Sequence, residues 1–327
     1  MTKDKFIIIT SINSINESIK KIIKLKDYQL VVVGDKKTPQ YKNDNLVFLD
    51  IKSQKKLQFE SLKTCPYNSY QRKNIGYLYA ISNNAKIIAE TDDDNYPLYN
   101  WGNVKFEEKQ ADVVLFPKIC NIYSEYTNKK IWPRGFPLDH ILKNERKKIT
   151  NKKHVRVGIW QGLVNGDPDV DAIYRLTLGH KIKFSDNMSY VLAKNVYCPF
   201  NSQNTFWEKS FFSYLYLPVT VSFRVTDILR GYVAQRCLWE HNAHLGFTGP
   251  TMFQDRNKHD LIEDFKSEIP CYVLANKIID ILDNMSLSDN PSDNLIKIYT
   301  KLIDNGITKP KEMISLKGWL KDIDSLS

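Results

Sequence analysis

The chain has 327 residues, of which 42% are hydrophobic and 12% aromatic. This composition supports one large α/β domain with a tail, or two domains, and it excludes bulk disorder. The 47 Lys and Arg residues exceed the 37 Asp and Glu residues by ten, a balance that suits an anionic partner such as nucleotide phosphates or anionic lipid. The abundance of Lys, Ile and Asn is equally typical of a protein from an AT-rich genome.

The cysteines and the apolar segments indicate the compartment. Five scattered cysteines without a CxxC pair predict reduced, buried thiols in a cytosolic protein. The apolar run 6–9 is too short for a signal peptide or a membrane span, and no run elsewhere reaches 18 apolar residues. We therefore expect a cytoplasmic protein, and peripheral contact with the inner face of a membrane is compatible with its charge.

The first third of the chain alternates between strand and helix patterns. Short runs of β-branched residues predict strands over residues 6–10, 30–33, 46–49 and 86–90, and apolar residues at helical spacing predict helices over 14–26 and 70–82. This order predicts a mainly parallel sheet that is covered on both faces, of the Rossmann-like α/β class. Ligands of such sheets bind at the carboxyl ends of the strands. The polar residues at those ends are Thr10, Ser11, Asn13, Asp35 and Asp92 to Asp94.

The rest of the chain carries fewer strand signals. Residues 111–116 predict a fifth strand, and the Pro, Gly and aromatic residues between 117 and 204 predict long loops around a site. Helices are expected over 225–240, 273–285, 294–304 and 311–326. We predict one domain over residues 1–268 and a helical accessory region over residues 269–327.

An acidic cluster follows the strand 86–90. Three adjacent carboxylates, Asp92, Asp93 and Asp94, repel one another, and a divalent cation is the usual way to offset this repulsion. Mg²⁺ or Mn²⁺ would fit, because both prefer oxygen ligands and leave positions open for phosphate. The alternative is a solvated acidic turn. Arg72 and Lys73 open the preceding helix, where two cations at a helix N-terminus suit a diphosphate or form an ordinary surface pair.

Four segments together resemble known glycosyltransferases. The Asp92–Asp94 cluster matches the DxD motif of GT-A enzymes. Segment 132–138, Trp-Pro-Arg-Gly-Phe-Pro-Leu, and segment 162–172 resemble the reversibly glycosylated polypeptides, which are UDP-arabinopyranose mutases. With the segment 254–260, Gln-Asp-Arg-Asn-Lys-His-Asp, the combination is most similar to the STELLO glycosyltransferase-like proteins, from about residue 6 to residue 265.

This resemblance implies a GT-A fold and a nucleotide-sugar donor, with a UDP-sugar expected. It places Arg134 and Gly162 beside the donor. GT-A enzymes often complete the metal shell with a late Asp or His, and Asp255 and then His259 stand nearest the matching place.

Three further aspartates are candidate catalytic residues. Inverting GT-A enzymes use a carboxylate at a helix start to deprotonate the acceptor, and Asp227 has this position unless it only caps the helix. Asp169 and Asp171 belong to an alternating acidic segment with Asp167. They either accept hydrogen bonds from sugar hydroxyls or cap the helix that follows.

The leading hypothesis is sugar transfer to a hydroxyl acceptor, a glycan or a lipid-linked precursor, in cell-surface glycan synthesis. A UDP-sugar mutase is the enzymatic alternative, because an Arg in the segment matching Arg134 carries a sugar covalently in that family. A catalytically silent glycosyltransferase partner is a third hypothesis. Nucleic acid is not an expected partner, since the basic residues are dispersed and no RNP, KH or zinc-finger pattern is present. The sequence leaves the oligomeric state, the sugar and the anomeric outcome open.

Overall fold

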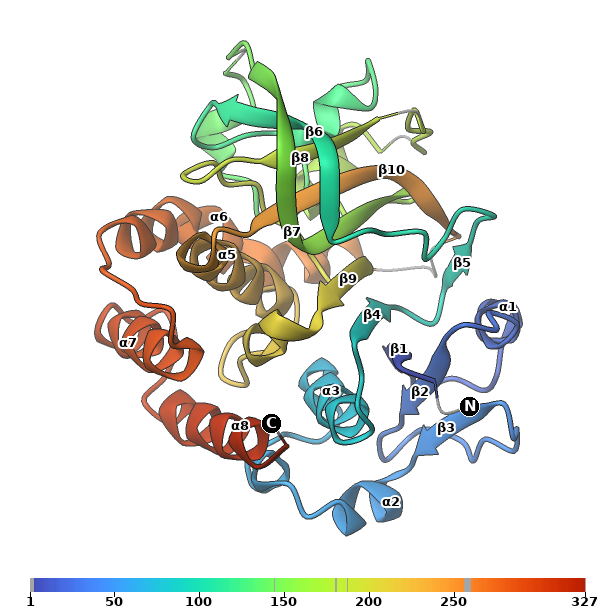
Figure 1. Ribbon diagram of the computed structural model, residues 1–327. Helices are drawn as coiled ribbons and strands as arrows, with labels where there is room; N and C mark the ends of the chain where they lie inside the picture. The colour runs from blue at the N-terminus through green and yellow to red at the C-terminus, as the bar shows by residue number, and fades with distance from the viewer. Residues whose placement is uncertain (1–2, 144, 180, 187, 256–259, 327) are drawn as a thin grey trace.

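The computed structural model describes residues 3–143, 145–179, 181–186, 188–255 and 260–326. Within these residues ten strands form one sheet, in the order β3-β2-β1-β4-β9-β7-β6-β8-β10-β5 (Figure 1). The strands are β1 (Lys5–Thr10), β2 (Gln29–Val33), β3 (Leu46–Leu49), β4 (Ile87–Thr91), β5 (Asn95–Pro97), β6 (Glu107–Phe116), β7 (Lys148–Gly166), β8 (Ser189–Leu192), β9 (Asn204–Glu208) and β10 (His244–Gln254). The predicted α/β class is confirmed.

The first four strands form the predicted parallel half. β3, β2, β1 and β4 pair in parallel, and the central residues of β1 and β2 are buried because helices lie against the sheet. These helices include α1 (Glu17–Ile23), α2 (Ile51–Lys56) and α3 (Lys73–Ser82). Gly76 in α3 sits so close to β1 that a Cβ would lie 2.5 Å from Ile8 Cγ2. The runs of β-branched residues thus predicted this half correctly.

The second half of the sheet differs from the prediction. β9 pairs antiparallel with β4, and beyond it parallel and antiparallel pairings mix, so that the described sheet has five of each kind. The expectation of a mainly parallel sheet therefore holds only for its first four strands. The expectation of long loops over 117–204 was wrong, because this segment contains the 19-residue strand β7, helix α4 (Ala172–Thr177) and strand β8. Most residues in the first part of β7 are exposed, so its sequence lacks the apolar alternation of a half-buried strand.

Four longer helices complete the chain: α5 (Thr226–Leu238), α6 (Leu261–Asp283), α7 (Pro291–Asp304) and α8 (Glu312–Leu326). The predicted boundary between residues 268 and 269 falls inside α6, whose carboxylate Glu268 accepts a hydrogen bond from the first residue of α4. Helix α8 returns to the N-terminal half and lies beside α3 (Figure 1). Its Asp322 accepts hydrogen bonds from the backbone N–H groups of Glu60, at 2.7 Å, and Ser61, at 2.8 Å, at the short helix η1 (Glu60–Lys63).

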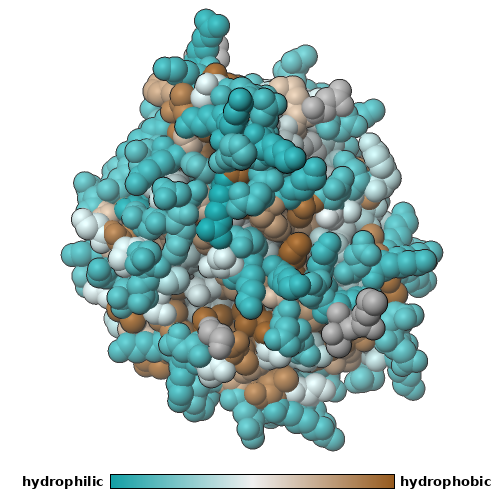
Figure 2. Space-filling view, viewed as in Figure 1, coloured by the Kyte–Doolittle hydropathy of each residue, from teal (hydrophilic) through white to brown (hydrophobic). Residues whose placement is uncertain are grey.

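The distribution of hydrophilic side chains and the state of the cysteines match what the composition predicts. Figure 2 shows hydrophilic side chains over most of the visible face, with hydrophobic ones in separate patches. All five cysteines are unpaired and buried, as predicted: Cys65, Cys120, Cys198, Cys237 and Cys271. None of the helices within the described ranges has the length and apolarity needed to cross a membrane.

Candidate active site

The carboxyl ends of β1, β2 and β4 open into one pocket of about 410 Å³, as the parallel topology predicts. Its other side is lined by Ser202 and Gln203 just before β9, by Gln254 at the end of β10 and by Asp227 at the start of α5. Eleven of the residues singled out in the sequence line it: Thr10, Ser11, Asn13, Asp35, Arg72, Asp92, Asp93, Asp94, Arg134, Asp169 and Asp227. Segments that are far apart in the chain therefore meet at one polar pocket.

One end of the pocket is built from the loops after β1 and β2. Asp35 accepts hydrogen bonds from the N–H groups of Lys36, at 2.7 Å, and Ser69, at 3.2 Å, and these bonds fix its carboxylate. Arg72 is 3% exposed and donates to Gln54 and to the carbonyl oxygens of Cys65 and Pro66. Its guanidinium therefore holds a loop at the rim of the pocket in addition to adding positive charge.

The acidic cluster lies at the end of β4, with a different donor set for each carboxylate. Asp92 is half-buried, and Lys73 Nζ lies 3.5 Å from its Oδ1. Burial raises the pKa of Asp92, and the Lys73 ammonium opposes that shift. Asp93 accepts hydrogen bonds from Ser11 and, at 3.0 Å, from Asn13, while Asp94 Oδ2 accepts from Gln254 Nε2 at 2.9 Å. The loop after β1 is thus tied to the cluster.

Of the predicted metal ligands Asp92, Asp94, Asp255 and His259, the described residues place Asp92 and Asp94 at the pocket. Within the described ranges no three His, Cys, Asp or Glu side chains are arranged to hold a metal ion. Asp255 is not among the pocket residues, and it faces Lys181 at 3.5 Å with a side chain that is 70% exposed; His259 lies outside the described residues. Asp92 and Asp94 still fit a cation that takes its remaining ligands from phosphate oxygens and water, which is how proteins usually hold Mg²⁺.

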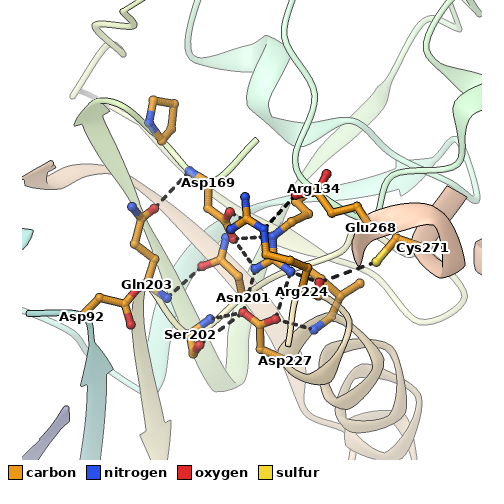
Figure 3. A network of polar contacts seen from close by, with 12 residues as sticks. Asp92, Arg134, Asp169, Asn201, Ser202, Gln203, Arg224, Asp227, Glu268 and Cys271 are labelled. Atoms are coloured by element: carbon orange, nitrogen blue, oxygen red, sulfur yellow. Dashed lines mark hydrogen bonds and ion pairs between the residues drawn. The ribbon is translucent and has the colours of Figure 1, made fainter. Parts of the chain in front are cut away.

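Arg134 occupies the opposite end of the pocket, between two aspartates (Figure 3). Its Nε lies 2.9 Å from Asp169 Oδ1, and its Nη2 lies 2.6 Å from Asp169 Oδ2 and 2.9 Å from Asp227 Oδ2. Its Nη1 donates to Asp227 Oδ1, at 3.1 Å, and to the carbonyl oxygen of Arg224. All five N–H groups of the guanidinium therefore have acceptors. Burial opposes the charge, but the two carboxylates raise the pKa of Arg134 well above its usual value.

Asp227 and Gly135 complete this cluster. Asp227 Oδ2 also accepts from the backbone N–H of Ser202, at 3.3 Å, and from its hydroxyl, at 3.2 Å. Asp227 therefore does more than cap α5, whose N-cap position is Val225. Gly135 has a φ of +82°, and a Cβ there would lie 2.3 Å from Ile228 Cγ2 in α5. This close approach requires glycine next to Arg134.

Three other predicted residues lie outside the pocket lining. Asp171 caps α4 by accepting from Tyr174 N at 2.8 Å, and it accepts from Trp132 Nε1 at 2.6 Å, so the cap alternative holds for Asp171. Burial raises the pKa of Asp171 to about 6. Gly162 lies inside β7, where a Cβ would lie 2.4 Å from Asn204 Nδ2. Lys73 acts on the pocket through Asp92.

The structure adds pocket residues that were not among the expected site residues. They are Tyr70, Ser202, Gln203, Phe223, Arg224 and Gln254. Tyr70 donates to Asp92 at 3.3 Å, and Lys73 donates to the Tyr70 hydroxyl at 2.7 Å. Gln254 is the first residue of the segment 254–260, and the other five belong to none of the four resembling segments. Gln203 lies just before β9 and Gln254 ends β10, and β7 pairs with both of these strands.

Strands whose polar carboxyl ends line a pocket are typical of α/β proteins that bind a ligand at that edge of the sheet. Comparison with known proteins narrows this class. The family model "STELLO glycosyltransferases" matches residues 224–327, which run from the start of α5 through the C-terminal helices. The predicted resemblance to the STELLO proteins is therefore confirmed.

Two curated relatives from Arabidopsis thaliana match nearly the whole chain. "Probable glycosyltransferase STELLO1" is 28% identical over 344 residues, covering 98% of this chain and 44% of the relative. "Probable glycosyltransferase STELLO2" is 27% identical over 346 residues, with the same coverage of 98% and 44%. This chain thus spans less than half the length of these relatives. Among solved structures, "M. tuberculosis glucosyl-3-phosphoglycerate synthase" matches with a TM-score of 0.37 and 9% identity, over 84% of this chain and 80% of that one.

Proposed function

We propose that this protein is a glycosyltransferase that moves a sugar from a nucleotide-sugar, a UDP-sugar, to a hydroxyl group of a glycan or lipid-linked acceptor. The observation that carries the proposal is the convergence of the acidic cluster at the end of β4 with the Arg134 cluster in one pocket. The similarity to the STELLO proteins supports it.

The two ends of the pocket suit different parts of the reaction. In this proposal the nucleoside binds at the loops after β1 and β2, near Asp35, and the diphosphate lies by Asp92 and Asp94. A bound Mn²⁺ or Mg²⁺ would supply positive charge for the departing diphosphate. The acceptor hydroxyl loses its proton as its oxygen bonds to the sugar carbon, and the bond from that carbon to the diphosphate breaks. Asp227 can take this proton only when its ion pair with Arg134 opens.

The state of Arg134 supports a transferase over a mutase that carries its sugar on arginine. A nitrogen nucleophile needs a free lone pair, and the protonated guanidinium has none. The two carboxylates hold Arg134 in this protonated form and occupy its N–H groups. The basic surplus of the chain further suits an anionic membrane at the cytoplasmic face, as the setting for cell-surface glycan synthesis.

Product analysis tests the proposal. With Mn²⁺ and the correct donor, the protein should release UDP slowly, and the correct acceptor should accelerate the release by orders of magnitude. Asp94→Ala should lower turnover at least about 100-fold if charge stabilisation of the diphosphate is lost. Equal rates in EDTA would remove the cation from the proposal, and ring-form interconversion without UDP release, followed by NMR of the sugar, would identify a mutase.

A further inference from the structure

A chain of hydrogen bonds crosses the pocket wall from Asp169 to Asp94. The backbone N–H of Asp169 donates to Gln203 Oε1 at 3.1 Å, and Figure 3 shows Gln203 reaching toward that group. Gln203 Nε2 donates to Gln254 Oε1 at 2.7 Å. Gln254 Nε2 then donates to Asp94 Oδ2 at 2.9 Å. Two amide side chains thus link the acidic cluster to the residue that holds Arg134.

The donor and acceptor roles in this series of hydrogen bonds are fixed by the backbone N–H of Asp169 at one end. A backbone N–H can only donate, so Gln203 must turn its carbonyl oxygen to Asp169 and its NH₂ group to Gln254. Gln254 must then accept through its oxygen, which leaves its NH₂ group for Asp94. A flip of either amide would place two donors or two acceptors face to face, so the orientation at Asp94 depends on Asp169.

Both glutamines are held rigidly. Each is 5% exposed, and the backbone N–H of Gln203 donates to Asn201 Oδ1 at 3.0 Å. Gln254 is the last residue of β10, and its carbonyl oxygen accepts from Asp167 N at 3.3 Å. Beside it Gly166 has a φ of +88°, and a Cβ there would lie 2.4 Å from the Gln254 carbonyl oxygen. The close approach of β7 to the end of β10 therefore depends on this glycine.

We infer that Gln203 and Gln254 are positioning residues that couple the acidic cluster to the Arg134 cluster. Gln254 turns the Asp94 carboxylate toward the pocket, and Gln203 keeps Gln254 in the orientation that donates. A ligand that holds the Asp94 carboxylate in place therefore also affects the hydrogen bond made by the backbone N–H of Asp169. The carboxylate of Asp169 in turn binds Arg134. The inference rests on the proposed function only for the identity of that ligand, a cation with a diphosphate.

Cation binding gives the first test. Free Mn²⁺ measured by electron paramagnetic resonance, in the presence of UDP, reports affinity without turnover. Gln254→Leu should weaken Mn²⁺ binding about tenfold, or about 1.4 kcal/mol, because Asp94 loses the hydrogen bond from Gln254 to its Oδ2. Gln203→Leu should weaken it similarly, although Gln203 does not touch Asp94, because Gln254 can then flip. An unchanged affinity in Gln203→Leu would overturn the coupling.

Two further variants distinguish a positioning role of Gln203 from general destabilisation of the fold. Gln203→Glu keeps the size of the side chain and its bond to Asp169 N, but it cannot donate to Gln254, so it should weaken Mn²⁺ binding as Gln203→Leu does. Gln235→Leu is the matched control: this glutamine in α5 is 1% exposed and bonds only to backbone groups of Val196 and Cys198 in the described contacts. It should leave Mn²⁺ affinity unchanged, and an equal loss there would point to general destabilisation.

Hydrogen exchange of backbone amides tests the same series of hydrogen bonds without a cation. The amide of Asp169 should exchange faster in Gln254→Leu than in the parent protein, although the two residues make no direct side-chain contact in the described bonds. Equal exchange rates would refute the linkage. If the parent protein binds no Mn²⁺ at all, the cation part of the proposed function fails, and the exchange rates still decide whether the glutamines act together.

Discussion

Arg134 joins three segments of the chain that are distant in sequence. Its guanidinium binds Asp169 before α4, Asp227 at the start of α5 and the carbonyl oxygen of Arg224. The two carboxylates are 9% and 7% exposed, so little water is available to replace the arginine. A buried ion pair of this kind is costly to break from one side, because an uncompensated charge remains.

Arg134→Lys should therefore destabilise the protein by about 3 kcal/mol. A lysine ammonium keeps the charge but lacks the planar fork that serves both carboxylates at once. The free energy of unfolding in urea measures the loss. Arg156→Lys is the control, since Arg156 pairs with Glu208 at 2.9 Å on a partly exposed surface, and it should cost less than about 1 kcal/mol. Equal losses in the two variants would contradict the argument.

Pocket residues could be predicted from the sequence where they directly follow a strand that an apolar run identifies. Asp92 and Asp94 follow a buried run of apolar residues, so their place at a strand end could be inferred from sequence. Gln254 was not expected at the site, because it ends a strand that the sequence pattern does not indicate. The resemblance instead indicates Asp255, the next residue, whose side chain is 70% exposed and faces Lys181.

At the scale of elements, burial decided which parts of the fold could be predicted. β1 and β2 are buried along most of their length, and their apolar runs identified them. β7 combines an exposed first part with a buried second part, and His154 within it has a φ of +53°. Such a strand has no single period, so the sequence pattern indicated loops instead.

The cap of α4 gives the protein a predictable response to pH. The pKa of Asp171 is about 6 in the folded state, compared with an ordinary value of 3.8. Between about pH 4 and pH 6 the folded chain keeps a proton that the unfolded chain has released. The contribution of Asp171 to the free energy of unfolding is therefore fully present below about pH 4, and it is lost as the pH rises through 6.

Urea unfolding between pH 4.5 and pH 6.5 tests this response in the parent protein and in Asp171→Asn. Subtracting the variant removes the contributions of other carboxylates. The difference should fall with rising pH, by at most about 1.4 kcal/mol for each pH unit. A difference that stays constant, or rises, would show that burial does not raise the pKa of Asp171.

At the scale of the whole molecule, the C-terminal helix α8 is bound to earlier parts of the chain. Trp319 in α8 is fully buried and donates to the carbonyl oxygen of Ser213 at 2.9 Å. On the same helix Asp322 accepts from the backbone of η1, which precedes α3. From these contacts we expect the two predicted regions to unfold together as one cooperative unit.

Trp319→Ala should lower stability by about 3–5 kcal/mol, because it removes a large buried ring and leaves a carbonyl oxygen without its donor. Calorimetry should record one transition at a lower temperature than in the parent protein. Ile314→Ala, on the same helix at a residue that is 65% exposed, should change little. Two transitions, of which only one moves, would instead support a separate helical region.

The contact between Gln254 and Asp94 has a consequence for synthesis on the ribosome. The two residues are 160 positions apart, and Asp227 and Asp322 also follow the acidic cluster late in the chain. A nascent polypeptide that has already extruded β1 to β4 therefore lacks Gln254, which donates to Asp94, and helix α8, whose Asp322 binds η1. Asp92 and Asp93 already have partners in the N-terminal half, whereas the bond from Gln254 to Asp94 can form only after most of the protein has left the exit tunnel.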